Sequence, residues 1–117
     1  PNILNESIYK VTKKIKVNIK TLDSVLSKKK LNNSLMKIDV QGYEYQVLKG
    51  SSKLLNKIKY IILEISSKNI YQNQLGKKHL FSFLKKKNFR LVKIYNEDKL
   101  SKNISQHDYF FENSKLK

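Results

Sequence analysis

Cysteine, alanine and tryptophan are absent from this chain of 117 residues, and Arg90 is its single arginine. The absence of cysteine excludes a disulfide framework, a thiolate metal site and a cysteine nucleophile, and it is typical of proteins from a reducing cytoplasm. Long apolar runs are also missing, since no stretch approaches the roughly 18–20 apolar residues that a membrane-spanning helix needs. We therefore expect a cytoplasmic protein without a membrane span.

Acidic residues are few, so the chain carries a net charge of +16 at pH 7. Such an excess favours nucleic acid or another anion as a partner, because clustered lysines release counterions from phosphate. Nucleic-acid surfaces usually also use the planar arginine fork, however, and 24 of the 25 basic residues here are lysines. Lysine, asparagine and isoleucine together supply 48 of the 117 residues, which indicates a drift of the composition toward A/T-rich codons. We expect much of the charge to be solvated surface, with no specific nucleic-acid partner.

Hydrophobic periodicity predicts alternating strands and helices along the chain. Residues 14–20 alternate between apolar and polar side chains, as in a strand with one buried face. Asp23 is expected to cap a short helix. Gly50 is expected either to interrupt the helix that begins at Tyr43 or to permit its close approach to the sheet. The remaining expected elements are strands at 35–40 and 59–66, a helix at 76–87, a strand at 89–95, a turn at 96–98 and a last strand at 108–112.

This order predicts an α/β fold in a single domain spanning residues 1–117. Alternation of strands and helices favours right-handed crossovers and a mainly parallel sheet. The near-continuous apolar run at 59–66 is typical of a strand that is covered on both faces, as in parallel sheets. The last two strands are close in sequence and are expected to form an antiparallel hairpin.

Two carboxylates stand at the ends of expected strands. Asp39 lies at the end of strand 35–40, before a tight Gln41-Gly42 turn, and Glu64 lies near the end of strand 59–66. In open α/β sheets, ligands bind in the crevice beyond the carboxyl ends of the strands. If the two strands are parallel neighbours, both carboxylates face the same rim of the sheet.

Each carboxylate also has a structural interpretation. Asp39 could cap the helix that begins at Tyr43, and Glu64 could pair with a nearby lysine. Glu44 falls in the first helical turn, where the helix dipole stabilises a carboxylate without any function. Asp39, Glu44 and Glu64 could together bind a divalent metal through oxygen, but no spacing demands one, so we predict no metal site. His107 is a remote further candidate, and His79, on a lysine-rich helix, is expected on the surface.

Several motifs then follow one another along the chain: Thr21-Leu22-Asp23, Lys37-Ile38-Asp39-Val40-Gln41-Gly42-Tyr43-Glu44, Val47-Leu48-Lys49-Gly50 and Ile61-Ile62-Leu63-Glu64. In this order they resemble the C-terminal half of the FkbM-family methyltransferases. That family has TLD before a helix, then KID-V/T-E/Q-G-x-E-x-x-VLKG, then an I-I-x-E strand. The later segments FLKKKNFRLVKI and QHDYFFEN resemble the closing helix, strand and hairpin, so the resemblance covers about residues 15–113.

The resemblance implies a partial Rossmann-like methyltransferase fold that uses S-adenosylmethionine. It further implies transfer of the methyl group to a hydroxyl oxygen of a small-molecule or glycan-like acceptor. Asp39 and Glu64 are then the candidate catalytic residues, and Asp39, Val40 and Gln41 are the candidate cofactor contacts. Methyl transfer to an unactivated hydroxyl needs in-line positioning and a base that accepts the proton.

The first half of the family pattern is absent from this sequence. That half holds a glycine-rich D-x-G-A-N-x-G turn, whereas the three glycines here are Gly42, Gly50 and Gly76, and none lies in such a loop. We therefore expect the chain to be the C-terminal half of a methyltransferase domain, with little affinity for the cofactor on its own.

The alternative is a small basic α/β module that binds nucleic acid or another anion without catalysis. Its support is the interleaving of aromatic residues with lysines, since exposed rings stack on bases. The rings that carry this hypothesis are Tyr9, Tyr71, Phe81 and Tyr95.

Overall fold

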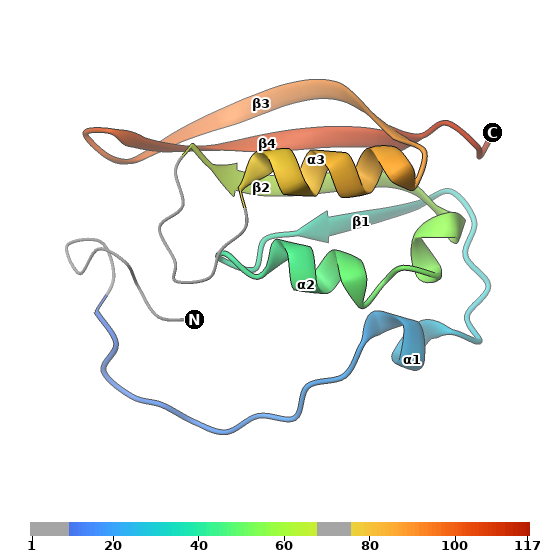
Figure 1. Ribbon diagram of the computed structural model, residues 1–117, viewed down its shortest axis with the longest axis horizontal. Coiled ribbons are helices and arrows are strands. Elements are labelled where there is room, and N and C mark those ends of the chain that lie inside the picture. The colour runs from blue at the N-terminus through green and yellow to red at the C-terminus, as the bar shows by residue number, and fades with distance from the viewer. Residues whose placement is uncertain (1–9, 68–75) are drawn as a thin grey trace.

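The computed structural model describes residues 10–67 and 76–117 (Figure 1). Tyr9 and Tyr71 lie outside these residues. The elements in chain order are α1 (Leu22–Leu26), β1 (Ser34–Ile38), α2 (Glu44–Lys49), the short 3₁₀ helix η1 (Leu54–Lys57), β2 (Ile58–Ser66), α3 (Lys77–Lys86), β3 (Phe89–Ser101) and β4 (Ile104–Asn113).

The four strands form one sheet in the order β1-β2-β4-β3. Strands β1 and β2 are parallel neighbours joined through α2, and β3 and β4 form an antiparallel hairpin, so both of these predictions are confirmed. The prediction of a mainly parallel sheet is wrong, because β2 also pairs antiparallel with β4. In a mainly parallel sheet, β3 would lie beside β2 after the crossover through α3. Instead the hairpin turns back, and β4 occupies the place beside β2.

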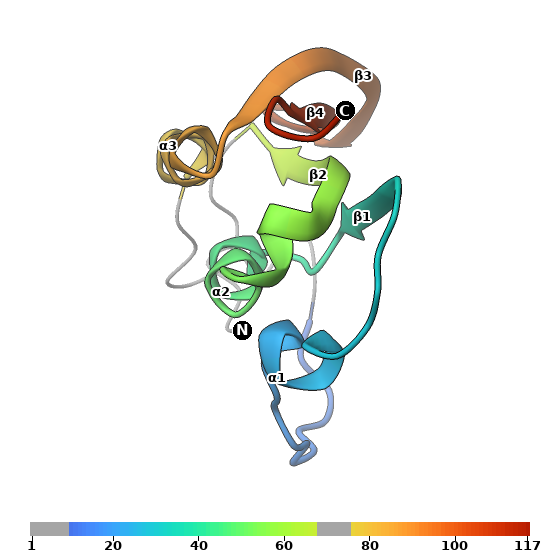
Figure 2. The same cartoon turned by 90° about the vertical axis from the view of Figure 1, so that its right-hand side faces the viewer.

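Helices α2 and α3 lie on the same face of this sheet (Figure 2). The core between the two helices and the sheet contains Ile61, Leu63 and Ile65 of β2, each at most 2% exposed. Leu80 and Leu84 of α3 are completely buried against this layer. Alternate residues of a strand point to opposite faces, so Tyr60, Ile62 and Glu64 point to the other face of β2. Among the described residues, no helix is long and apolar enough to cross a membrane.

The segment 14–20 is not a strand, contrary to the prediction from its alternating pattern. Ile15, Val17 and Ile19 are 73%, 69% and 77% exposed, and the chain here runs extended below the body of the molecule (Figure 1). The alternation predicts a strand only if a neighbouring strand accepts its backbone hydrogen bonds. In the described part of the chain this segment joins no sheet.

Helix α1 is capped by Thr21, whose hydroxyl accepts a hydrogen bond from the backbone N–H of Ser24, so the predicted Asp23 cap is wrong. The Asp23 carboxylate instead accepts hydrogen bonds from the backbone N–H groups of Lys53 and Leu54, at 3.0 and 2.8 Å. It therefore holds the start of η1 against α1.

Gly50 ends α2, as expected from the sequence. A Cβ at this position would lie 3.4 Å from the Thr21 side chain, and the Gly50 carbonyl accepts a hydrogen bond from the Asp23 backbone N–H. The start of α1 therefore packs closely against the end of α2, at a distance that is still ordinary van der Waals contact for a Cβ.

The turn expected at residues 96–98 is not a chain reversal. Strand β3 continues to Ser101, and its register with β4 shifts between Tyr95 and Asp98. Asn96 sits in this irregularity with a left-handed φ of 56°. Asparagine tolerates this conformation, and a β-bulge accommodates residues that otherwise favour a turn.

Candidate functional site

The parallel pairing of β1 and β2 brings two carboxyl groups together at one rim of the sheet. Ile38 lies opposite Leu63, so the next residues, Asp39 and Glu64, are neighbours. Asp39 is the largest cause of the raised pKa of Glu64, as expected for two carboxyl groups close enough to share a proton. The two residues come from the ends of β1 and β2, which are separated in the sequence by α2 and η1.

A tight turn positions Asp39. Gln41 and Gly42 both adopt left-handed φ angles, 54° and 99°, and the value at Gly42 is one that residues with a side chain rarely adopt. The Gln41 amide donates a hydrogen bond to Asp39 Oδ1 at 3.2 Å. Asp39 is therefore held from the turn side by an amide and from the sheet side by Glu64.

Glu44 stabilises the same turn from the start of α2. It lies in the first turn of α2, is 3% exposed, and its Oε2 accepts a hydrogen bond from the Gly42 backbone N–H at 2.7 Å. Burial raises the pKa of Glu44, and the hydrogen bond from the Gly42 backbone opposes that rise. These contacts favour the structural interpretation of Glu44.

The structural interpretations of Asp39 and Glu64 do not describe what these residues do. Helix α2 has Tyr43 at its N-cap position, with no side-chain hydrogen bond there, so Asp39 does not cap it. In the described part of the chain, the lysines and Arg90 form no ion pair with Glu64. Asp39 is thus not a helix cap, and Glu64 is not the partner of a described lysine in an ion pair.

The proton-binding properties of Glu64 follow from its neighbours. The hydrogen bond with Asp39, burial, and the negative charges of Asp39 and Asp108 raise the pKa of Glu64 to about 7, while Lys37 opposes the rise. A carboxyl group that titrates near neutral pH is well suited to accept a proton from a reacting group. Asp39 and Glu64 therefore form a proton-sharing pair with acid–base potential.

Asp108 is a member of this neighbourhood that the sequence analysis missed. It lies on β4 directly opposite Glu64 and is 8% exposed. Its only sequence signal is an acidic residue at the start of the apolar run DYFF. Its position beside Glu64 depends on the antiparallel register of β2 and β4, which no local pattern reveals.

His107 does not join the pair. It lies opposite Ile65, one residue out of phase with Asp108, so its side chain points to the other face of the sheet. Its Nε2 lies 3.3 Å from Glu97 Oε2, and its ring meets Tyr109 edge-on. His79 is exposed on α3, as expected.

The structure does not favour the nucleic-acid alternative. The Phe81 ring packs edge-on against Tyr109 and Phe111, and Phe81 is partly buried against the core. Tyr95 is half-buried with Lys93 over its ring, at 5.9 Å. Neither ring offers a free platform for bases.

Within residues 10–67 and 76–117, no group of three or more His, Cys, Asp or Glu side chains is arranged to hold a metal ion.

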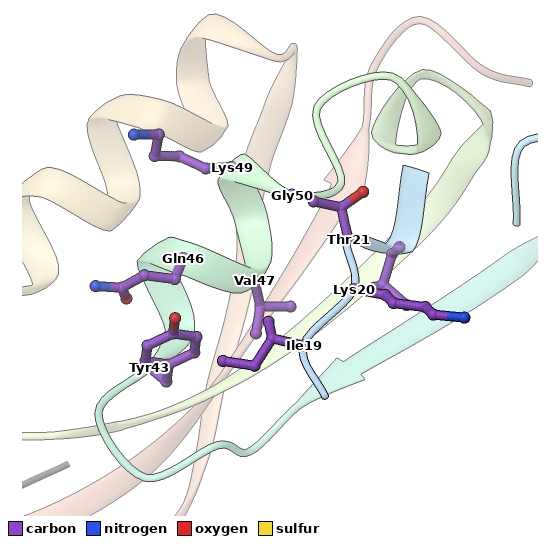
Figure 3. A pocket seen from close by; sticks show the side chains of 9 residues that line it. Ile19, Lys20, Thr21, Tyr43, Gln46, Val47, Lys49 and Gly50 are labelled. Carbon is purple, nitrogen blue, oxygen red and sulfur yellow. The ribbon is translucent and has the colours of Figure 1, made fainter. Parts of the chain in front are cut away.

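A pocket of about 420 Å³ lies between α2 and the segment that precedes α1 (Figure 3). Ile19, Tyr43 and Val47 line its centre, and Lys20 and Lys49 extend away from it (Figure 3). The remaining lining residues are Thr21, Leu22, Gln46 and Gly50. None of the described residues that line it is acidic, so this mainly apolar pocket is separate from the Asp39–Glu64 pair.

Comparison with known proteins gives one match. The family model described as the methyltransferase FkbM domain matches residues 2–91, a span that contains Asp39 and Glu64. It ends early in β3, so Asp108 lies beyond it. No curated protein and no solved structure gives a significant match.

Proposed function

The chain belongs to the FkbM methyltransferase domain family, and from this premise we propose that it serves methyl transfer from S-adenosylmethionine to a hydroxyl oxygen of a small-molecule or glycan acceptor. The observation that carries the proposal is the placement of Asp39 beside Glu64 at the rim of the parallel strands β1 and β2, where Asp39 raises the pKa of Glu64. Transfer to an unactivated hydroxyl requires a base that takes the proton as the oxygen–methyl bond forms. A carboxyl pair that shares a proton provides such a base.

We assign the base role to Glu64 and an orienting role to Asp39. With a pKa of about 7, a large fraction of Glu64 is ionised at neutral pH, and it still binds a proton well. The Glu64 carboxylate would accept the hydroxyl proton of the acceptor as the acceptor oxygen takes the methyl group, while the methyl–sulfur bond of the sulfonium breaks and leaves a neutral thioether. Once Glu64 carries this proton, it can donate a hydrogen bond to Asp39, which the Gln41 amide holds in place.

Asp39, Val40 and Gln41 are the proposed contacts for the methionine end of the cofactor. S-adenosylmethionine supplies its methyl group from a positively charged sulfonium, which a nearby carboxylate stabilises. Asp39 is exposed and Val40 is 37% exposed, so this turn is accessible to a ligand. The residues present therefore fit that end of the cofactor.

The adenosine end of the cofactor finds no counterpart in this sequence. The glycines at 42, 50 and 76 do not form a glycine-rich loop, and such loops bring the backbone close to the nucleoside in Rossmann-like folds. We propose that this chain is the C-terminal half of a methyltransferase domain, and that the glycine-rich half completes the site.

The test measures transfer of labelled methyl groups to a panel of hydroxyl acceptors by the chain joined to a glycine-rich half. Glu64→Gln and Asp39→Asn keep size and hydrogen bonding but remove charge. We expect Glu64→Gln to lower kcat by about a hundred- to ten-thousandfold, the usual contribution of a positioned base, and Asp39→Asn to lower it as well. Asp98→Asn, an exposed position on β3, is the control and should leave kcat unchanged.

The outcome separates the two roles. If only Glu64→Gln slows transfer, Asp39 is not needed for chemistry. Near-normal turnover in both variants would show that this pair is not the catalytic site.

A further inference from the structure

Strand β4 places a third carboxylate beside the Asp39–Glu64 pair. Asp108 lies directly opposite Glu64 in the antiparallel register of β2 and β4. Directly opposite residues of an antiparallel pair have their side chains on the same face of the sheet, a few ångströms apart. Asp108 is 8% exposed, so little water screens its charge from Glu64.

Asp108 is held by an irregular part of β3. The Asn96 amide donates a hydrogen bond to Asp108 Oδ2 at 3.0 Å. Asn96 has a φ of 56° and lies where the register between β3 and β4 shifts. Bulges of this kind redirect a side chain, and this one aims an amide at a single oxygen of Asp108.

The other carboxylate oxygen has no such partner. Asp108 Oδ1 is buried and accepts no hydrogen bond from the described residues. An unpartnered buried carboxylate oxygen lowers the stability of the fold, because its hydration is lost without replacement. Threonine, which has a single side-chain oxygen and suits a β-strand, would place no second oxygen there, so fold stability does not explain the aspartate.

The charged groups that act on Glu64 come from both neighbouring strands. Asp39 and Lys37 approach from the β1 side, and Asp108 approaches from β4. On β3, Tyr95 lies opposite Asp108, and Asn96 contacts it. Among the charged groups that act on the pKa of Glu64 in the described part of the chain, Asp108 is the one from the hairpin side.

We propose, on the basis of the proposed function, that Asp108 is a positioning residue whose buried negative charge makes Glu64 a stronger proton acceptor. Two neighbouring negative charges, Asp39 and Asp108, then favour the protonated form of Glu64 from opposite sides. The raised pKa of Glu64 agrees with this arrangement, since the charge of Asp108 contributes to it after Asp39 and burial.

The test follows the carboxyl carbon of Glu64 by ¹³C NMR during a pH titration of the chain itself, so it does not require catalysis. In Asp108→Asn, which removes the charge and keeps the shape, we expect the Glu64 midpoint to fall by about half a pH unit. Asp108→Thr is a second neutral variant that suits a β-strand and should give the same shift. Equal midpoints in wild type and both variants would refute the proposal.

Glu112→Gln is the matched control. Glu112 is also a carboxylate on β4 and on the same face, but it lies opposite Tyr60 and contacts Arg90 and Lys59. Its removal should leave the Glu64 midpoint in place. An equal shift in this control would mean that net charge acts, and loss of folding in both Asp108 variants would assign Asp108 a purely structural role; either result overturns the proposal.

The pH profile of methyl transfer distinguishes this proposal from the proposed function. If both hold, Asp108→Asn moves the lower limb of the profile to lower pH and lowers kcat less than Glu64→Gln does. If the NMR midpoint moves but Glu64→Gln leaves turnover intact, Asp108 acts on Glu64 and the proposed function is wrong.

Discussion

Glu64 takes its chemical character from residues that are remote in the sequence. Asp39 precedes it by a complete strand–helix crossover, and Asp108 follows it by another helix and most of a hairpin. Lys37 provides the opposing positive charge from β1. A surface glutamate becomes a group that titrates near pH 7 because three strands meet beside it.

The raised pKa of Glu64 makes folding stability depend on pH. The folded-state pKa of about 7 lies above the ordinary value of 4.5, so in between the folded chain binds more protons at Glu64 than the unfolded chain does. The contribution is fully favourable below this window and is lost as the pH rises through it. We predict that Glu64→Gln, which stays neutral, gains stability relative to wild type as the pH rises from about 5 to about 8.

Urea unfolding at several pH values measures this prediction. Asp98→Asn, at an exposed position on β3, serves as the control, and its stability should stay parallel to wild type over the same range. A constant stability difference between Glu64→Gln and wild type would contradict the raised pKa.

At the level of elements, α1 is too short to be stable alone. It contains five residues, and isolated helices below about 12–15 residues are marginal in water. Its stability comes from contacts with the α2–η1 connection: the Asp23 carboxylate binds two backbone N–H groups of η1, and the Asp23 N–H binds the Gly50 carbonyl. The TLD motif thus starts α1 through the Thr21 cap and also joins it to η1 through Asp23.

We predict that Asp23→Ala destabilises the fold by about 2 kcal/mol, because two backbone donors lose a charged acceptor. Asp23→Asn should lose less, since its amide oxygen still accepts one hydrogen bond. Ser27→Ala, at the exposed C-terminal end of α1, is the control and should change stability by less than about 0.5 kcal/mol. Chemical denaturation measures all three, and equal losses for Asp23→Ala and Ser27→Ala would argue against the link.

Strand β1 has one neighbour in the four-stranded sheet, β2, and its other edge is not paired within that sheet. Leu35 on this strand is 55% exposed. An open edge with an apolar side chain favours pairing with another strand, whereas the net charge of +16 opposes close approach of copies of this chain.

At the scale of the whole molecule, the proposed function assigns the chain one rim of a cofactor site, and its sequence contains no glycine-rich loop. We predict that the chain alone binds S-adenosylmethionine with a dissociation constant well above the micromolar range. Calorimetry is the direct measurement, and the chain joined to a glycine-rich half is the positive control. A micromolar constant for the chain alone, equivalent to about 8 kcal/mol of binding free energy, would show that the described residues suffice.

Local pattern in the sequence was enough to locate most of the elements. The helix at 77–86 and the strands around Leu35 and Ile61 follow directly from apolar periodicity, because a helix or strand must bury one stripe or face. The family motif was also readable in the sequence, and with it Asp39 and Glu64 as residues at strand ends. Their adjacency followed from the rule that a crossover helix joins parallel neighbours.

Only the tertiary structure decided which strands are partners and what each carboxyl group does. The alternation at residues 14–20 has no effect without a partner strand, and the polar residues at 96–98 form a bulge instead of a turn. The hairpin's return places β4 beside β2, which makes the sheet mostly antiparallel and sets Asp108 opposite Glu64. Strand pairing depends on contacts between segments that are distant in the sequence. The pKa of Glu64 depends on such contacts as well, because burial and the charges of Asp39, Asp108 and Lys37 determine it.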